Sequence, residues 1–453
     1  MTVERRKVAV TGLGIVSSLG NDITSFWDAC LCGKTVVSRI PEVWRHYYSP
    51  KSSHWSPLVA PDYSSKGIRR SDLLSFDQSA LNAMYAADDA VQQSGCTKSL
   101  TDERAGRHRI REFDTYQCGV YIGSGLGCIT SAFDNYVAHL LGQLGPEYLS
   151  RDYHSEISPL ANELSENIAD HPRVLPIAST KCMANSLSAL LSIRYGFQGP
   201  SETCIAACAA GSTAIARAYE QIANGRVDFA LAGGSEFYGD RAGGVFMAFD
   251  RLNTLAKERE NDENVNRPFD VGRTGFLFSQ GAACILALED ARSAYARGAN
   301  ILATLKGAFS TCDAYSLAAL APDGNAVRRM IQGTLNDAGL SAEEIDYVNA
   351  HGTGTAHNDA LEAELIESEF PHRPFVNSTK SLLGHTIGAC GAIEAAVAVL
   401  GIQTGSLHPS INLKSPVRDL NFVLGRTSAD IRNAFSQNFG FGGHNVGLVF
   451  GKD

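Results

Sequence analysis

Short apolar runs bounded by glycine alternate with longer, often alanine-rich stretches along this chain of 453 residues. The short runs are rich in β-branched residues and predict strands. These strands are expected over Val8–Thr11, Val120–Gly123, Phe229–Gly233, Ala283–Leu288, Ile345–Ala350, Pro374–Ser378 and Val446–Phe450. Helices are expected between them, over Asp77–Gln93, Ser186–Tyr195, Ser212–Asn224, Asn325–Ala338, Asp359–Glu369 and Cys390–Ile402. This alternation favours an α/β fold whose sheets are covered on both faces.

The two halves of the chain repeat one design, in which strands end in glycine-rich turns and a long alanine-rich helix follows. The repeat is compatible with two fused copies of one unit, which we divide into residues 1–295 and 296–453. Three polar segments without periodicity predict surface loops, at Pro41–Arg70, Thr97–Asp114 and Lys257–Asp270. The basic cluster of the second segment could dock a partner, although a solvated loop is the simpler interpretation.

Composition excludes several classes of protein. Hydrophobic residues make up 44% and charged residues 19%, and the formal net charge is −9, which argues against a nucleic-acid partner. No run of eighteen apolar residues is present, so no membrane span is expected. The longest candidate, Gly391–Ile402, contains Glu394 and predicts a buried helix. Eleven scattered cysteines and no apolar leader predict reduced thiols in a cytoplasmic protein.

The segment around Cys208 predicts a nucleophile. A short strand over Glu202–Ala206 is followed by Cys208 among alanines and a glycine, and then by a helix. A reactive side chain on a sharp strand-to-helix turn needs small neighbours, and a helix N-terminus lowers a thiol pKa and can bind an oxyanion. A buried, unreactive cysteine is the alternative. Cys204 lacks a second Cys/His pair at ligand spacing, so we predict a packed thiol there and no metal site.

Two histidines are placed where a sheet presents catalytic groups. His351 ends a predicted strand in DYVNAHGTGTAHND, and His385 follows Lys380 in FVNSTKSLLGHTIGACGAIEAAVAVL. Either histidine alone could be structural. A cysteine on an elbow together with two histidines can form a site in which a thiolate attacks an acyl thioester. Neutral imidazoles then donate hydrogen bonds to developing oxyanions.

The C-terminal segment SQNFGFGGHNVGLVFG places Phe439 to Gly443 on a turn between two strands. Closely spaced glycines allow a backbone N–H to approach a substrate oxygen, and a simple tight hairpin is the alternative. Two other glycine motifs fail. VTGLGIVSS has Ser17 where a dinucleotide fingerprint needs a glycine, and GHTIG has Thr386 where a serine-hydrolase elbow needs its nucleophile.

Together these segments resemble the β-ketoacyl-acyl-carrier-protein synthases, the elongating Cys-His-His ketosynthases of the thiolase-like superfamily. The motifs that carry the resemblance are AACAAGS, NAHGTGT, STKSLLGHTIGACGAIE and FGFGGHN, and the similarity spans nearly the whole chain. It implies a thiolase-like five-layered α/β/α/β/α duplication. The first half would carry the nucleophile and the second half the two histidines.

The resemblance also implies roles. Cys208 would accept the acyl chain, His351 and His385 would promote malonyl decarboxylation, Lys380 would support His385, and Glu394 would organise the polar network below them. The amides of Cys208 and Phe441 would form an oxyanion hole, with the Phe441 ring as a gate. Thr353, Thr355 and Phe439 would contact the substrate. No bound cofactor is implied, because an acyl carrier protein presents the substrates on phosphopantetheine.

The resemblance leaves several alternatives open. The reaction could serve fatty-acid elongation or a discrete type II polyketide or polyene system. The protein could be a homodimer, or it could pair with a chain-length-factor-like subunit. A non-catalytic chain-length factor would lack Cys208, and a thiolase would need a second catalytic cysteine near the C-terminus, where this chain has FGFGGHN.

Overall fold

Strand and helix formation follows the alternation of apolar runs closely. The computed structural model describes residues 5–46, 48–103, 106–135, 178–240, 242–258 and 265–452. The strands are β1 (Val8–Val16), β2 (Ser38–Arg39), β3 (His54–Ser56), β4 (Lys98–Asp102), β5 (Arg107–Ile110), β6 (Cys118–Ser124), β7 (Ser201–Ile205), β8 (Phe229–Phe237), β9 (Phe278–Ser279), β10 (Gly281–Asp290), β11 (Ala303–Cys312), β12 (Tyr347–Asn349), β13 (Phe375–Asn377), β14 (Ser406–Leu407), β15 (Thr427–Ser428), β16 (Asn433–Gly440) and β17 (His444–Gly451). The α-helices are α1 (Ile23–Leu31), α2 (Arg70–Ser75), α3 (Gln78–Gln93), α6 (Ala178–Cys182), α7 (Ser186–Tyr195), α8 (Ala210–Ala223), α9 (Gly244–Arg251), α10 (Ala291–Ala296), α11 (Asn325–Ala338), α12 (Ala356–Glu369), α13 (Lys380–Leu383) and α14 (Cys390–Thr404).

The central sheet is a duplication. Its ten strands follow the order β13-β12-β16-β17-β11-β1-β10-β8-β6-β7. If the strands of each half are numbered along the chain, both halves have the order 3-2-4-5-1. Strand 2 is parallel to strands 3 and 4, and strand 5 is antiparallel to strands 4 and 1 in each half. The halves join where β1 pairs with β11 over three residues.

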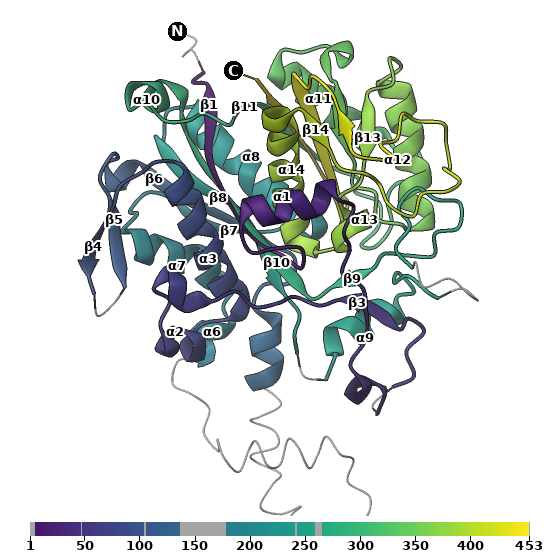
Figure 1. Cartoon of the computed structure of the whole chain (residues 1–453), viewed down its shortest axis with the longest axis horizontal. Helices are drawn as coiled ribbons and strands as arrows, with labels where there is room; N and C mark the ends of the chain where they lie inside the picture. The colour runs from purple at the N-terminus through teal and green to yellow at the C-terminus, as the bar shows by residue number, and fades with distance from the viewer. Residues whose placement is uncertain are drawn as a thin grey trace, which may run out of the picture.

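The helices form three layers around the two half-sheets, and the halves lie on opposite sides of the molecule in Figure 1. Helices α3 and α7 pack on the outer face of the first half-sheet, and α11 packs on the outer face of the second, beside α12. Helices α8 and α14 contact each other and strands of both halves. The described structure therefore has the predicted five-layered α/β/α/β/α architecture, with α8 and α14 as its middle layer.

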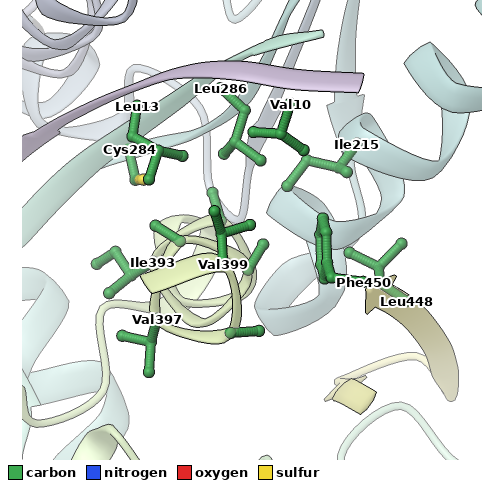
Figure 2. Close-up of a cluster of buried hydrophobic side chains, with 14 of the residues drawn as sticks. Val10, Leu13, Ile215, Cys284, Leu286, Ile393, Val397, Val399, Leu448 and Phe450 are labelled. Atoms are coloured by element: carbon green, nitrogen blue, oxygen red, sulfur yellow. The ribbon is translucent and has the colours of Figure 1, made fainter. Parts of the chain in front are cut away.

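The middle layer explains the composition of α14. Figure 2 views this helix nearly end-on, with side chains of β1 and β10 on one side and β17 on another. Its residues from Cys390 to Ile402 are all buried, so no face is left for polar residues. The segment Ile387–Thr404 is long and apolar enough to cross a membrane, but 89% of it is buried inside the protein. The prediction of a buried helix is confirmed.

All eight predicted strands, with Glu202–Ala206 among them, and all six predicted helices are present, most with shifts of a few residues at their ends. The predicted surface loops are corrected. Thr97–Asp114 contains an antiparallel hairpin of β4 and β5. Pro41–Arg70 buries Trp44 and Trp55 against other aromatic rings. Of Lys257–Asp270, the described residues 265–270 are buried. Thr97–Asp114 remains largely at the surface, as a hairpin instead of a loop. Scattered aromatic residues without periodicity gave no sign that Pro41–Arg70 packs against other rings.

Candidate active site

A sharp turn between β7 and α8 carries Cys208. Residues Ala207–Ala209 form one 3-10 turn, and Ala207 adopts the left-handed region with φ = 48°. The end of β16 presses against this turn, because a Cβ on Gly440 would lie 2.6 Å from the carbonyl oxygen of Ala206. Close backbone approach of this kind requires glycine at that position. The predicted strand-to-helix elbow is present.

His385 lies at the equivalent turn of the second half. The 3-10 turn Ile387–Ala389 leads into α14, and Ile387 has φ = 49°, as Ala207 does in the first half. The Ile387 backbone N–H donates to Nδ1 of His385 at 3.2 Å, and Nε2 of the ring lies 3.0 Å from Sγ of Cys208. Because Nδ1 accepts a hydrogen bond, the neutral ring carries its hydrogen on Nε2. That N–H points at the sulfur.

His351 follows β12 and faces His385. The ring centroids of the two histidines are 5.6 Å apart, and the rings are nearly perpendicular. The backbone N–H of His351 donates to Oε1 of Glu362 on α12 at 2.7 Å, which holds the loop after β12 in place. The ring of Phe439 on β16 packs against His351 with its centroid 5.4 Å away. Residues from two strands and a connecting turn therefore meet at the elbow.

A buried ion pair lies behind His351. Nζ of Lys380 is 2.5 Å from Oε1 of Glu394 and 3.2 Å from Nδ1 of His351. The family resemblance predicts that Lys380 supports His385; in the structure the direct contact of Nζ is with His351, while the charge of Lys380 also lowers the pKa of His385. Nδ1 of His385 already accepts a backbone hydrogen bond, and Lys380 at the start of α13 reaches His351 instead. The side chains of Lys380 and Glu394 are each about 1% exposed. Because water does not solvate these charges, each must be balanced by the other and by nearby hydrogen bonds.

One cavity of about 380 Å³ gives access to these groups. Its lining includes the predicted nucleophile, both histidines and the predicted substrate contacts: Cys208, His351, His385, Thr353, Thr355, Phe439 and Phe441. The hydroxyls of Thr353 and Thr355 lie 2.9 Å apart. Phe441 is partly buried and packs against the apolar cluster that contains Cys208. Lys380 and Glu394 are absent from the lining, so they act from behind the cavity wall.

Burial controls the protonation of the site. It lowers the pKa of both His351 and His385 well below the usual value, and the charge of Lys380 lowers both further. Both rings are therefore neutral at physiological pH. Burial raises the pKa of Cys208 to about 12, while Lys380 and the backbone N–H groups of Phe441 and Cys208 act in the opposite direction. The two amides predicted to form an oxyanion hole thus lie close to the sulfur.

Within the described part of the chain, one cluster offers donor atoms for a metal ion. Ligating atoms of His351, Cys390 and Glu394 lie within 4.8 Å of one another. The ammonium of Lys380 already contacts the histidine nitrogen and the carboxylate, so a metal cation would meet its repulsion at short range. The chemistry of the site is that of a thiol between two neutral imidazoles.

Comparison with known proteins agrees with this geometry. The family model described as "Beta-ketoacyl synthase, N-terminal domain" matches residues 5–293, and "Beta-ketoacyl synthase, C-terminal domain" matches residues 302–414. The chain belongs to the β-ketoacyl synthase family. The resemblance drawn from the sequence motifs is confirmed.

Curated relatives of this ketosynthase cover it almost completely. The 3-oxoacyl-[acyl-carrier-protein] synthase 2 of Synechocystis is 32% identical over 99% of both chains. The protein of the same name from Coxiella burnetii is 33% identical, also over 99% of both chains. The chloroplastic 3-oxoacyl-[acyl-carrier-protein] synthase II of Arabidopsis thaliana is 33% identical over 99% of this chain and 76% of its own.

Solved structures show the same fold. A ketosynthase in complex with a type II polyketide synthase acyl-carrier protein, bound to a hexaketide, has a TM-score of 0.81 at 28% identity. The alignment covers 99% of the chain described here and 100% of that ketosynthase chain. The ishigamide ketosynthase/chain length factor has a TM-score of 0.80 at 27% identity, with the same coverage. The predicted thiolase-like fold class is confirmed.

Sequence reasoning missed three polar residues of this ketosynthase site. Asn438 donates to Oε2 of Glu394 at 2.5 Å, and Glu362 fixes the loop of His351. Sγ of Cys390 donates to the carbonyl oxygen of Cys208 at 3.1 Å. An amide within a strand and a glutamate within a helix carry no distinctive pattern. The position of Asn438 directly before FGFGG was the one available signal.

Proposed function

We propose that this ketosynthase condenses an acyl thioester with malonyl-acyl carrier protein and releases a β-ketoacyl-acyl carrier protein and CO₂. One observation carries the proposal: two neutral imidazoles flank Cys208, and each has its Nδ1 engaged as an acceptor. Each ring therefore has its N–H on Nε2. Two N–H donors beside a thiol suit an enolate formed next to an acyl-cysteine.

The first half-reaction acylates Cys208. The sulfur attacks the thioester carbonyl of the incoming acyl group, the new C–S bond forms, and the carrier's thiol leaves with the proton. Nε2–H of His385 donates to the sulfur at 3.0 Å and stabilises its developing thiolate. The backbone N–H groups of Cys208 and Phe441 bind the oxyanion of the tetrahedral intermediate.

The second half-reaction uses the histidines together. Loss of CO₂ from the malonyl thioester leaves an enolate, whose oxygen accepts hydrogen bonds from Nε2–H of His351 and His385. The enolate carbon attacks the acyl carbonyl on Cys208, and the C–S bond then breaks to release the Cys208 thiolate, which takes up a proton from solvent to give the thiol. Lys380 and Glu394 hold His351 from behind. Neutral rings are needed throughout, and burial supplies them.

The substrates would arrive on the phosphopantetheine arm of a separate acyl carrier protein. The paired hydroxyls of Thr353 and Thr355 line the cavity and offer hydrogen-bond partners to the amides of that arm. A carrier complex is the subject of one of the structural relatives. Either fatty-acid or type II polyketide chains fit this proposal, since relatives of both kinds align over 99% of the chain.

A second subunit of the same fold would dock along β7. This strand is at the edge of the sheet, and its Ile205 is 53% exposed. Ile193 on α7 and Met183, just after α6, are also about half exposed. An exposed edge strand with apolar side chains beside it is a ready site for pairing with another chain. Light scattering of the pure protein would show a dimer if the partner is a second copy. A monomer that dimerises only with a chain-length-factor-like subunit would identify a heterodimer.

Two further predictions remain proposals. The division at residues 295 and 296 falls at the end of α10 and is supported by the repeated strand order of the two halves. A cytoplasmic location is supported by the eleven cysteines, all of which are free thiols.

The proposal is tested by intact mass spectrometry. The protein is incubated with a panel of acyl-acyl carrier proteins, and then with malonyl-acyl carrier protein. We expect an acyl adduct on Cys208 and then a β-ketoacyl carrier product. An enzyme that forms no adduct with any carrier, and no product with a partner subunit present, would instead match the chain-length-factor alternative. A product formed from acetyl-coenzyme A without CO₂ release would indicate a thiolase.

A further inference from the structure

Asn438, on β16, connects the two halves of the site. Its side chain is fully buried and contacts Ser212 on α8, Glu394 on α14 and the ring of His351. Ser212 is the third residue of the helix that begins at the nucleophile elbow. One amide thus joins the helix of Cys208 to the histidine and carboxylate contributed by the second half.

The contacts determine which way the Asn438 amide faces. Nδ2 lies 2.5 Å from Oε2 of Glu394, and Oδ1 lies 2.5 Å from Oγ of Ser212. A carboxylate that is paired with Lys380 only accepts hydrogen bonds, so the NH₂ group must face it. The hydroxyl of Ser212 then donates to Oδ1. The second hydrogen of the NH₂ group faces Nδ1 of His351 at 3.3 Å, which is nearer than the other acceptor, Sγ of Cys390 at 3.8 Å.

Two donors therefore converge on Nδ1 of His351. The ammonium of Lys380 lies 3.2 Å from it and the Asn438 amide 3.3 Å from it. Neither group has a lone pair to offer, so Nδ1 must be unprotonated. We propose that Asn438 is a positioning residue of the ketosynthase reaction: with Lys380 it holds His351 in the tautomer whose hydrogen is on Nε2. The inference rests on the function proposed above.

The same tautomer arises differently at His385, where the donor to Nδ1 is the backbone N–H of Ile387. A backbone donor is fixed by the turn itself, whereas the donors at His351 are side chains and depend on residue identity. The titratable groups around His351 are Lys380 on α13, Glu394 and Cys390 on α14, Glu362 on α12, His385 before α14 and Cys208 across the cavity. Of these groups, Lys380 donates to Nδ1, and Asn438 is the uncharged donor beside it.

The test substitutes Asn438→Asp, which preserves shape and replaces the donor with an acceptor. A carboxylate beside Nδ1 accepts a hydrogen from the ring, so His351 should change to the Nδ1–H tautomer or the imidazolium. The protein is labelled with ¹⁵N-histidine, and long-range ¹H–¹⁵N spectra report which nitrogen is protonated. His351→Gln assigns the resonance. No substrate is added, so the result is independent of whether the proposed condensation occurs.

Gln437→Glu is the matched control. Gln437 is the adjacent residue of β16, is equally buried, and donates to a buried carboxylate, Oε1 of Glu362, at 2.8 Å. Within the described residues its side chain makes no hydrogen bond to the His351 ring, and its partner Glu362 binds only the backbone of His351. The control should lose comparable stability and retain the Nε2–H tautomer.

In Asn438→Asp we also expect malonyl decarboxylation to fall by about 10² to 10³, the loss typical of one oxyanion donor. Asn438→Leu is the second variant, since it lacks both donor and acceptor and keeps the size. In Asn438→Leu, the ¹⁵N resonance of the unprotonated Nδ1 of His351 should change its chemical shift, because one of its two hydrogen bonds is lost. Unchanged His351 resonances in folded Asn438→Asp and Asn438→Leu would overturn the proposal, and so would an equal tautomer change in Gln437→Glu.

Discussion

Removal of the His385 ring tests whether this histidine stabilises the Cys208 thiolate. Nε2 of His385 lies 3.0 Å from Sγ, and its tautomer makes it the donor. Burial raises the pKa of Cys208 to about 12, so the free thiolate is rare at neutral pH. His385→Ala should therefore lower the rate of every reaction that begins with this thiolate.

The magnitude follows from the hydrogen bond that is lost. A hydrogen bond to a charged group contributes about 1.5–3 kcal/mol, which corresponds to a thiolate population about 10 to 100 times smaller. The pKa of Cys208 should rise by one to two units. His351→Ala should change the thiolate population little, because Nδ1 of that ring faces Lys380. Malonyl decarboxylation should fall in both variants by about 10² to 10³.

The assay is alkylation of Cys208 by iodoacetamide, followed by intact mass spectrometry between pH 7 and 9. Because the thiol pKa lies above this range, the rate should rise about tenfold per pH unit. His385→Gln is the control, since its amide can return a donor near the position of Nε2. It should recover part of the lost rate. Equal alkylation rates in the parent and in His385→Ala, or an equal loss in His351→Ala, would refute the reasoning.

Three further substitutions probe other parts of the site. Cys208→Ala should fold normally and form no acyl adduct, and intact mass spectrometry would contradict this by finding condensation with an adduct on another cysteine. Phe441→Ala keeps the backbone N–H and removes the ring that is predicted to act as a gate, so malonyl decarboxylation without prior acylation should rise relative to condensation. Because the ring is only partly buried, Phe441→Ala should lower the free energy of unfolding by less than the ~3–5 kcal/mol typical of a buried phenylalanine. A large drop in melting temperature with an unchanged ratio of decarboxylation to condensation would identify a packing role. Glu394→Gln leaves the Lys380 charge buried without its partner, which typically lowers the free energy of unfolding by about 3–5 kcal/mol. In denaturant titrations, the double variant with Lys380→Met should recover part of this loss. If the losses of the two single variants simply add, Lys380 and Glu394 are not a coupled pair.

The secondary structure was predictable because the strands and helices of this chain have clear local patterns. Helices over Ser186–Tyr195 and Asn325–Ala338 occupy the predicted residues without any shift. The failures were segments such as Pro41–Arg70, whose aromatic residues follow no period and pack only because distant rings surround them. Whether an irregular segment is buried depends on what lies opposite, and local pattern does not contain that information.

The candidate site divides in the same way. Cys208, His351 and His385 could be selected from their immediate neighbours, because small residues and strand ends are local features. The partner of Lys380 could not, since His385 is closer to it in the chain and His351 is closer in space. The site contacts of Glu362, Cys390 and Asn438 are likewise with residues far away in the sequence: His351, Cys208 and His351.

The amino-acid sequence alone therefore determined the α/β class, the approximate positions of many strands and helices, and the residues able to carry the chemistry, since each depends on contacts within a few residues. The tertiary structure decided which nitrogen of each histidine holds the proton and which charges face one another. Cys208 and His385 lie 177 residues apart in the chain and 3.0 Å apart in space. Packing of the duplicated half-sheets around α8 and α14 brings them together, and the same burial keeps both imidazoles neutral.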